Sequence, residues 1–290
     1  MKRLSLAILM LLTLTWAQSA PQQAPASSAL KTLAKVDLTK PAADPAANAA
    51  QARYVLQRTI AALGGDAYLQ VTDVKQTGRG YGFYQNEPQG EGTVFTRYFR
   101  FPESERFEIQ PHRDEMQFFK AVKWVIIHVG DRGWETTYKG TREQTAKDLE
   151  EYVRRRPYDI DTVLRGWLPD PKTSLFFEGQ TIEATKQVYK VSLLNAKNQN
   201  VTVYVDLKTF LPVKKSFTYR DPRWKDIIEE ADLYDKFRYE HGVMTPHVVT
   251  RMRNNEMVAQ RFLQTVEFNT SLDERMFVPP PIDYDKMKKY

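Results

Sequence analysis

The chain has 290 residues and a formal charge of +6, and 42% of its residues are apolar, enough for the core of one large domain or two small ones. Basic and acidic residues are interspersed, which argues against the concentrated positive stripe that nucleic-acid binding needs. The absence of cysteine excludes disulfides, thiolate metal sites, a cysteine nucleophile and a lipid-modified N-terminal cysteine.

Residues 1–20 have the features of a secretory signal peptide. Lys2 and Arg3 precede a run of 14 uncharged residues, and Ala17-Gln18-Ser19 has the small-x-small pattern of a cleavage site. An uncleaved membrane anchor is the alternative, but a spanning helix needs about 20 apolar residues. We therefore expect export with cleavage after Ala17 or Ser19, and a cysteine-free exported chain suits the bacterial periplasm.

Residues 21–50 are rich in Ala, Pro and Gln, which predicts a flexible leader ahead of a folded domain over residues 51–290. The domain is expected to begin with a short amphipathic helix over residues 51–63. Its apolar side chains share one face at helical spacing, namely Leu56, Ile60 and Leu63. The pair Gly64-Gly65 supplies the left-handed stop that commonly ends a helix.

Most of the remaining chain consists of strand-like segments separated by short turns. They are residues 74–83, 93–101, 105–110, 122–129, 134–138, 175–182, 188–194, 201–205, 212–219, 228–239, 247–253 and 257–268. We expect about ten or eleven strands in a single antiparallel sheet, because neighbours are joined by turns rather than by helical crossovers. A sheet of this length curls, and its concave face must be covered by helices or by a ligand. The fold class is therefore mainly β (α+β).

A helical insertion interrupts the strands between residues 141 and 168. Thr141-Arg142-Glu143-Gln144 has the spacing of a capping box, and Pro157 stops the helix that follows. A second short helix is expected over residues 160–167. These helices and the helix over residues 51–63 are candidates to cover the concave face.

Several polar patterns could indicate chemistry, but simpler interpretations fit them. Gly78, Gly80 and Gly82 lack the spacing of a nucleotide-binding loop and more simply relieve crowding where a strand bends. Glu230 and Asp232 could share a strand face as the carboxylates of glycosidases do, although solvated charge at a sheet edge is the simpler interpretation.

Neither metal binding nor nucleophilic catalysis is predicted. The four histidines lack the spacing of zinc ligands, and no G-x-S-x-G motif is present. We expect no cofactor, no metal and no enzymatic activity.

Aromatic and aliphatic residues on the early strands give the strongest candidate site. Alternation places three phenylalanines on one strand face and puts Trp124 beside Ile126, with Trp134 just after the following turn. These side chains either form an ordinary core under the helices or line an internal apolar cavity. The predicted ligand-binding residues are Phe95, Phe99, Phe101, Trp124, Ile126 and Trp134.

Between residues 51 and 280 the sequence resembles the LolA/LolB-like superfamily of periplasmic lipoprotein-sorting carriers. The resemblance rests on the order of eight short motifs: Leu63-Gly64-Gly65, Gly130-Asp131-Arg132-Gly133-Trp134, Tyr189-Lys190-Val191, Val203-Tyr204-Val205-Asp206, Thr209-Phe210-Leu211-Pro212, His241-Gly242-Val243-Met244-Thr245-Pro246, Val266-Glu267-Phe268-Asn269 and Met276-Phe277-Val278-Pro279. It implies an unclosed, strongly curved half-barrel with helices across its mouth, whose cavity takes the acyl chains of a lipid or lipoprotein.

These observations predict a periplasmic, non-enzymatic carrier of lipid or lipoprotein acyl chains. Two alternatives remain open. One is an envelope sensor or scaffold domain of the same fold that binds another protein. The other is a periplasmic hydrolase that uses the carboxylates on the strand over residues 228–239.

Overall fold

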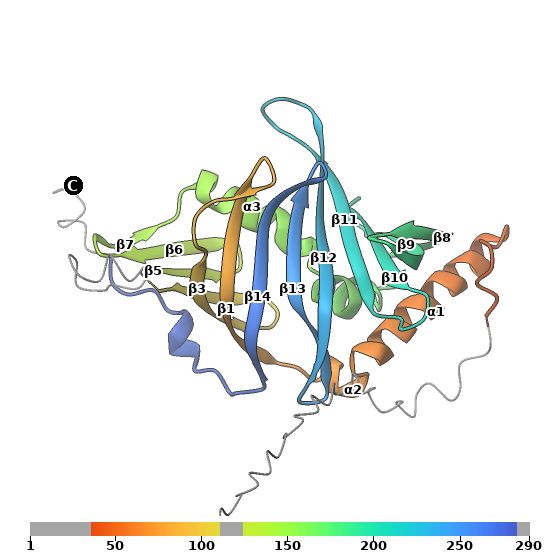
Figure 1. Ribbon diagram of the computed structural model, residues 1–290, viewed down its shortest axis with the longest axis horizontal. Helices are drawn as coiled ribbons and strands as arrows, with labels where there is room; N and C mark the ends of the chain where they lie inside the picture. The colour runs from red at the N-terminus through yellow and green to blue at the C-terminus, as the bar shows by residue number, and fades with distance from the viewer. Residues whose placement is uncertain (1–35, 111–123, 283–290) are drawn as a thin grey trace, which may run out of the picture.

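The computed structural model describes residues 36–110 and 124–282. The predicted signal peptide, the leader up to residue 35 and the first two residues of the predicted strand over residues 122–129 lie outside these ranges. Strands dominate the described chain and form one curved antiparallel sheet that is not closed into a barrel (Figure 1). The predicted fold class and the half-barrel implied by the resemblance are confirmed.

The sheet has 14 strands, more than the ten or eleven expected, because all twelve strand-like segments form strands and two short strands join them. Their bounds are β1 Asp73–Tyr84, β2 Glu87–Pro88, β3 Thr93–Arg100, β4 Ser104–Ile109, β5 Trp124–Val129, β6 Arg132–Thr137, β7 Gly140–Glu143, β8 Ser174–Glu183, β9 Lys186–Leu194, β10 Asn200–Asp206, β11 Pro212–Arg220, β12 Ile227–Glu240, β13 Val243–Arg253 and β14 Glu256–Phe268. The two strands that sequence reasoning missed, β2 and β7, have two and four residues and are too short for a recognisable alternation.

The strand order places β7 and β8 at opposite edges of the sheet. It runs β7-β6-β5-β4-β3-β1-β14-β13-β12-β11-β10-β9-β8, and β2 pairs with β1. Strands β7 and β8 follow one another in the chain, so the segment between them must travel across a face of the sheet. That segment holds α3 (Ala146–Arg155), η3 (Arg156–Tyr158), α4 (Ile160–Thr162) and η4 (Val163–Trp167). The predicted helical insertion is confirmed, including the second helix over residues 160–167.

The predicted start of the helical insertion is wrong. The predicted capping box at Thr141 does not form, because Thr141 lies in β7 and its hydroxyl is 2.9 Å from that of Thr136 in β6. The box forms one turn later, where Thr145 Oγ1 accepts from the Asp148 amide at 3.3 Å and Asp148 Oδ2 accepts from the Thr145 amide at 3.1 Å. Thr141, Arg142 and Glu143, which sequence reasoning placed at the start of the helix, therefore belong to a strand.

Helix α1 (Pro45–Leu63) lies over the β8 edge and contacts β8, β9 and β13 (Figure 1). It begins six residues before the predicted Gln51, because Asp44 Oδ2 accepts from the Ala47 amide at 2.7 Å and a proline occupies the first helical position. Leu38, within the predicted leader, is buried in the same core. The predicted apolar face is confirmed: Leu56 and Leu63 are buried, and Ile60 packs against the core.

The main hydrophobic core lies between α1 and η4 on one side and the strands from β8 to β11 on the other. Its fully buried side chains include Val55, Leu56, Val163, Val191 and Val203. The short helices α2 (Asp66–Leu69) and η5 (Glu274–Phe277) complete the described elements, and η5 contacts β4 and β5. Within the described residues, none of the helices is long and apolar enough to cross a membrane.

The predicted relief of crowding in the glycine-rich strand is confirmed at Gly78, whereas Gly80 and Gly82 lie in open surroundings. The register between β1 and β14 shifts at Thr77/Gly78, and a Cβ atom on Gly78 would collide with the carbonyl oxygen of Phe262. The turn predicted before Pro212 also forms: Asp206 Oδ1 accepts from the Thr209 amide at 2.8 Å. The bend in β1 and the turn before Pro212 could therefore both be predicted from the residues at those positions.

Candidate ligand cavity

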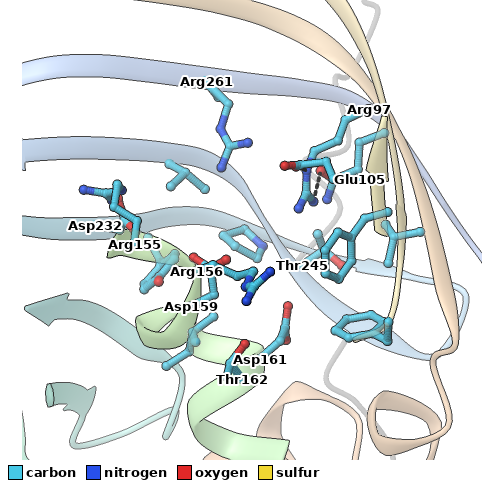
Figure 2. A pocket seen from close by; sticks show the side chains of 18 of the residues that line it. Arg97, Glu105, Arg155, Arg156, Asp159, Asp161, Thr162, Asp232, Thr245 and Arg261 are labelled. Atoms are coloured by element: carbon cyan, nitrogen blue, oxygen red, sulfur yellow. Dashed lines mark hydrogen bonds and ion pairs between the residues drawn. The ribbon is translucent and has the colours of Figure 1, made fainter. Parts of the chain in front are cut away.

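A cavity of about 540 Å³, the central cavity, lies between the concave face of the sheet and the helical segment that crosses it (Figure 2). Strands β1, β3, β4, β5, β12, β13 and β14 supply one wall. Tyr152, Arg155, Arg156, Ile160 and Asp161 from the crossing segment supply the other. The volume is typical of a binding site for a small molecule.

One end of the central cavity is mainly apolar, with the Arg165 guanidinium over the Phe101 ring as its cationic group. It lies where β1 begins, where β3, β12 and β14 end, and where α1 meets α2. Nine apolar side chains line it: Leu63, Val71, Val74, Phe99, Phe101, Phe237, Val243, Met244 and Phe268. Phe99 and Phe101 contact each other edge to face with ring centroids 4.8 Å apart.

The middle of the cavity is charged. Arg97 Nε on β3 donates to Glu105 Oε1 on β4 at 2.5 Å, and His128 stacks on Tyr152 with ring centroids 3.7 Å apart. Burial raises the pKa of the Glu105 carboxyl, but Arg97, together with His128 3.7 Å away, outweighs burial and holds that pKa well below its usual value. Glu105 is therefore an anion at neutral pH.

A buried ionic cluster fastens α3 to the sheet beside the cavity. Arg155 donates to Glu230 and, at 2.7 Å, to Asp232 Oδ1, and Lys215 Nζ lies 3.1 Å from Asp232 Oδ2. Arg154 Nη2 adds an ion pair to Glu230 Oε1 at 3.0 Å. Burial raises the pKa of Asp232, whereas Lys215 and Arg155 lower it by more, so the carboxyl stays ionised.

The cluster corrects the sequence interpretation of Glu230 and Asp232 as solvated charge at a sheet edge. Glu230 is fully buried, because β12 lies inside the sheet and α3 covers it. Alternation along β12 had correctly placed the two carboxylates on one face, but nothing in the sequence showed that this face lay under a helix. Within residues 36–110 and 124–282, no group of three or more His, Asp or Glu side chains is arranged to hold a metal ion.

Arg261 on β14 differs from the other arginines that line the central cavity. Arg97, Arg155, Arg156 and Arg251 are in ion pairs, and Arg165 donates to two backbone carbonyls. Arg261 has no ion pair or hydrogen bond with any other described residue. Its guanidinium points into the space between the Arg97–Glu105 pair and the Arg155–Asp232 pair (Figure 2).

A second cavity of about 560 Å³, the rim cavity, lies at the opposite ends of the same strands. Phe95, Phe107, Ile109 and Trp124 line it, together with the open backbone of Gly80 and Gly82. Arg261 is the one described residue that lines both cavities. Arg261 therefore lies between the rim cavity, which is mainly apolar, and the central cavity, which has both apolar and charged walls.

The structure divides the predicted site residues among three places. Phe99, Phe101 and Ile126 line the central cavity, as alternation predicted. Phe95 and Trp124 line the rim cavity, where Phe95 stacks on Phe107 with ring centroids 5.0 Å apart. Trp134 lines neither cavity.

Trp134 lies on the opposite, convex face of the sheet with Val125 and Ile127. The hairpin before it has two turn residues, so Val129 pairs with Arg132 and Ile127 with Trp134, whereas Ile126 pairs with Glu135. Cross-strand partners share a face, which separates Trp134 from Ile126. Counting this register from the turn would have excluded Trp134 from the predicted wall.

Sequence reasoning missed the charged residues of the cavity. The signal was present on β3, where Arg97 lies between Phe95 and Phe99 on the same face. An arginine between two residues of a predicted apolar wall must have a partner or face a cavity. No comparable signal marks Arg261, because its surroundings come from strands and helices distant in sequence.

No protein-family model and no curated protein matches the sequence. Solved structures do. A proposed outer membrane lipoprotein-sorting protein domain from Vibrio parahaemolyticus has a TM-score of 0.52 at 12% identity, over 79% of this chain and 97% of that one. A DUF1329 family protein from Desulfovibrio piger has a TM-score of 0.55 at 11% identity, over 80% and 97%. The chain therefore shares its fold with these two proteins, which confirms the resemblance at the level of the fold.

Proposed function

We propose that the protein is exported to the periplasm and carries a lipid, or the acyl chain of a lipoprotein, in its central cavity. The observation that supports this best is the apolar end of a cavity of about 540 Å³ enclosed between the sheet and the crossing helices. Each buried methylene contributes about 0.8 kcal/mol, so one long chain supplies several kcal/mol after the costs of ordering. The likeness to a lipoprotein-sorting domain favours the same ligand class.

The hydrolase alternative finds little support in the ionic cluster. A general acid needs a carboxyl that holds a proton near neutral pH. The pKa values of Glu230 and Asp232 are instead both lowered, because neighbouring cations outweigh the effect of burial. These carboxylates hold α3 in place, and we propose a protein that is not an enzyme.

Ile126 and Ile127 offer a matched pair of variants to test acyl binding. Ile126 lines the central cavity, and Ile127 is 1% exposed on the convex face. We expect Ile126→Glu to remain folded, because its carboxylate reaches the cavity, but to lose saturable binding of a fluorescent fatty acid. Ile127→Glu should unfold, since an unpaired buried carboxylate costs several kcal/mol. Circular dichroism and probe titration measure the two effects.

Extraction of the wild-type protein with organic solvent, followed by mass spectrometry, provides an independent check. Acyl-containing compounds should appear in the extract. Wild-type protein that yields no acyl compound and shows no saturable binding of an acyl probe would contradict the carrier function and favour the sensor or scaffold alternative.

A further inference from the structure

Arg261 lies in the middle of the concave face, and its strand neighbours provide no counterion. Its register partners are Gly80 on β1 and Val249 on β13, neither of which carries a polar side chain. The guanidinium enters the central cavity from the sheet (Figure 2). A buried or half-buried guanidinium is normally paired, so the unpaired state of Arg261 identifies a place for an external anion.

The charges around Arg261 also favour an external anion at this position. The carboxylates nearest to the neighbouring cations are already engaged, because Glu105 pairs with Arg97 at 2.5 Å and Glu151 pairs with Arg251 at 2.6 Å. Burial, followed by repulsion from Arg97 and Arg251, lowers the pKa of Arg261 to about 10. Arg261 is therefore still cationic at neutral pH, and a bound anion would relieve the repulsion.

The glycine row on β1 leaves room for a ligand beside Arg261. A Cβ atom on Gly80 would meet only Phe95 at 3.9 Å, and a Cβ atom on Gly82 would meet nothing within 4 Å. Side chains at these positions would otherwise occupy the floor of the rim cavity next to the guanidinium. The strand that bends the sheet therefore also keeps the approach to Arg261 open.

Apolar space lies on both sides of this cation. The apolar end of the central cavity lies toward one end of the strands, and Phe107, Ile109 and Trp124 of the rim cavity lie toward the other. A ligand that satisfies both features has a negatively charged head and a long hydrocarbon tail. Arginine binds carboxylate and phosphate oxygens through paired N–H donors, so either group fits the head.

We infer that Arg261 anchors the oxyanion head group, carboxylate or phosphate, of an amphipathic ligand whose tail occupies the adjoining apolar space. This inference rests on the proposed acyl-binding function and specifies its ligand class as anionic. Arg261 would act by ion pairing, and the walls of the cavities would accept the tail.

The test compares three ligands with the same oleoyl chain: oleate, oleoyl lysophosphatidate and uncharged monoolein. Intrinsic tryptophan fluorescence measures the Kd of each for the wild type, Arg261→Gln and Arg79→Gln. Arg79 on β1 is the matched control. It is exposed, and because it is next to Gly80 in the strand, it lies on the opposite face of the sheet from the cavity. We expect the wild type to prefer at least one anionic ligand over monoolein by about tenfold or more, the range of a charged hydrogen bond.

Arg261→Gln should abolish that preference while leaving the Kd for monoolein unchanged, and Arg79→Gln should retain it. The better anion in the wild type distinguishes a carboxylate head from a phosphate head. Should Arg261→Gln fail to fold, Arg261→Lys, which keeps the charge, should retain the preference over monoolein. Equal binding of all three ligands by the wild type, or a preference that survives in Arg261→Gln, would overturn the anchor and leave acyl binding intact. Failure of all three ligands to bind would reject both proposals.

Discussion

Glu105 and Arg97 form an ion pair on the cavity wall, with 16% and 18% of their side-chain surfaces exposed. At such burial the desolvation of both charges opposes their attraction, and removal of one partner leaves the other uncompensated. The depressed pKa of Glu105 shows that Arg97 and His128 outweigh the effect of burial. This pair therefore stabilises the fold only while the carboxyl is ionised.

Replacing this carboxylate should lower stability in a pH-dependent way. We expect Glu105→Gln to reduce the free energy of unfolding by about 2 kcal/mol or more at pH 7, because Arg97 loses its counterion. The folded-state pKa lies below the usual value of 4.5, so the contribution is complete above pH 4.5 and is lost as the pH falls toward the folded-state pKa. Urea denaturation of both proteins at several pH values measures the difference, which should narrow in acid.

The Arg100–Glu274 pair is the matched control for Glu105. Its two charged atoms are 2.6 Å apart, but 80% of the Glu274 side chain is exposed. Solvent screens such a pair, so Glu274→Gln should leave the unfolding curve unchanged. A stability loss in Glu105→Gln no larger than that in Glu274→Gln, or one independent of pH, would refute the assignment.

At the scale of single elements, β1 shows how one strand serves two purposes. Gly78 sits at the register shift, where its missing side chain allows the backbone of β14 to approach closely. Gly82 lies on the same face four residues later, in open space. The same residue type therefore permits a bend at one position and leaves open space at the other.

These two glycines should respond differently to the same substitution. Gly78→Ala should reduce the free energy of unfolding by about 2 kcal/mol or more, because its Cβ would collide with the carbonyl oxygen of Phe262. Gly82→Ala should be neutral or stabilising by about 0.5 kcal/mol, since glycine is the poorer strand residue. Urea denaturation midpoints compare the variants, and equal midpoints would show that the bend does not depend on Gly78.

Helix α3 is held by charge more than by apolar burial. Arg155 is its one buried residue, and it reaches Glu230 and Asp232 on β12. The helix thus covers the cavity through an ionic contact in a low-dielectric setting. A buried ion pair stabilises only when both partners are well placed. The capping box at Thr145 helps to place Arg155 by fixing the start of α3.

At the scale of the whole molecule, the crossing of the chain from β7 to β8 creates the site. The pairing of β1 with β14 joins the early strands to the late strands and leaves β7 and β8 at opposite edges. The segment between them has to pass over the sheet, and it passes over the concave face. The central cavity is the space that remains between the two.

Export can be tested on the whole chain. The earliest residues in the described hydrophobic core are Val36 and Leu38, so loss of residues 1–20 would leave that core complete. We expect protein from the periplasmic fraction to lack 17 to 20 N-terminal residues in an intact-mass measurement, because Ala17-Gln18-Ser19 fits a cleavage site. A full-length product held in the inner membrane would show that this segment is an anchor.

The sequence by itself determined the local features. Alternation identified most of the strands, Leu56 and Leu63 marked the buried face of α1, and Asp206 with Thr209 specified a turn. Each depends on contacts within a few residues, so composition and spacing are sufficient.

Only the tertiary structure decided the site. Alternation assigns side chains to two faces but does not say which face is concave, so it grouped Trp134 with Ile126 although register separates them. It also left Glu230 at a solvated edge, where the structure buries it beneath α3. The position of Arg261 depends on the pairing of β14 with β1, across register partners as distant as Val74 and Phe268. Burial and charge environment are sums over such distant neighbours, which no local pattern records.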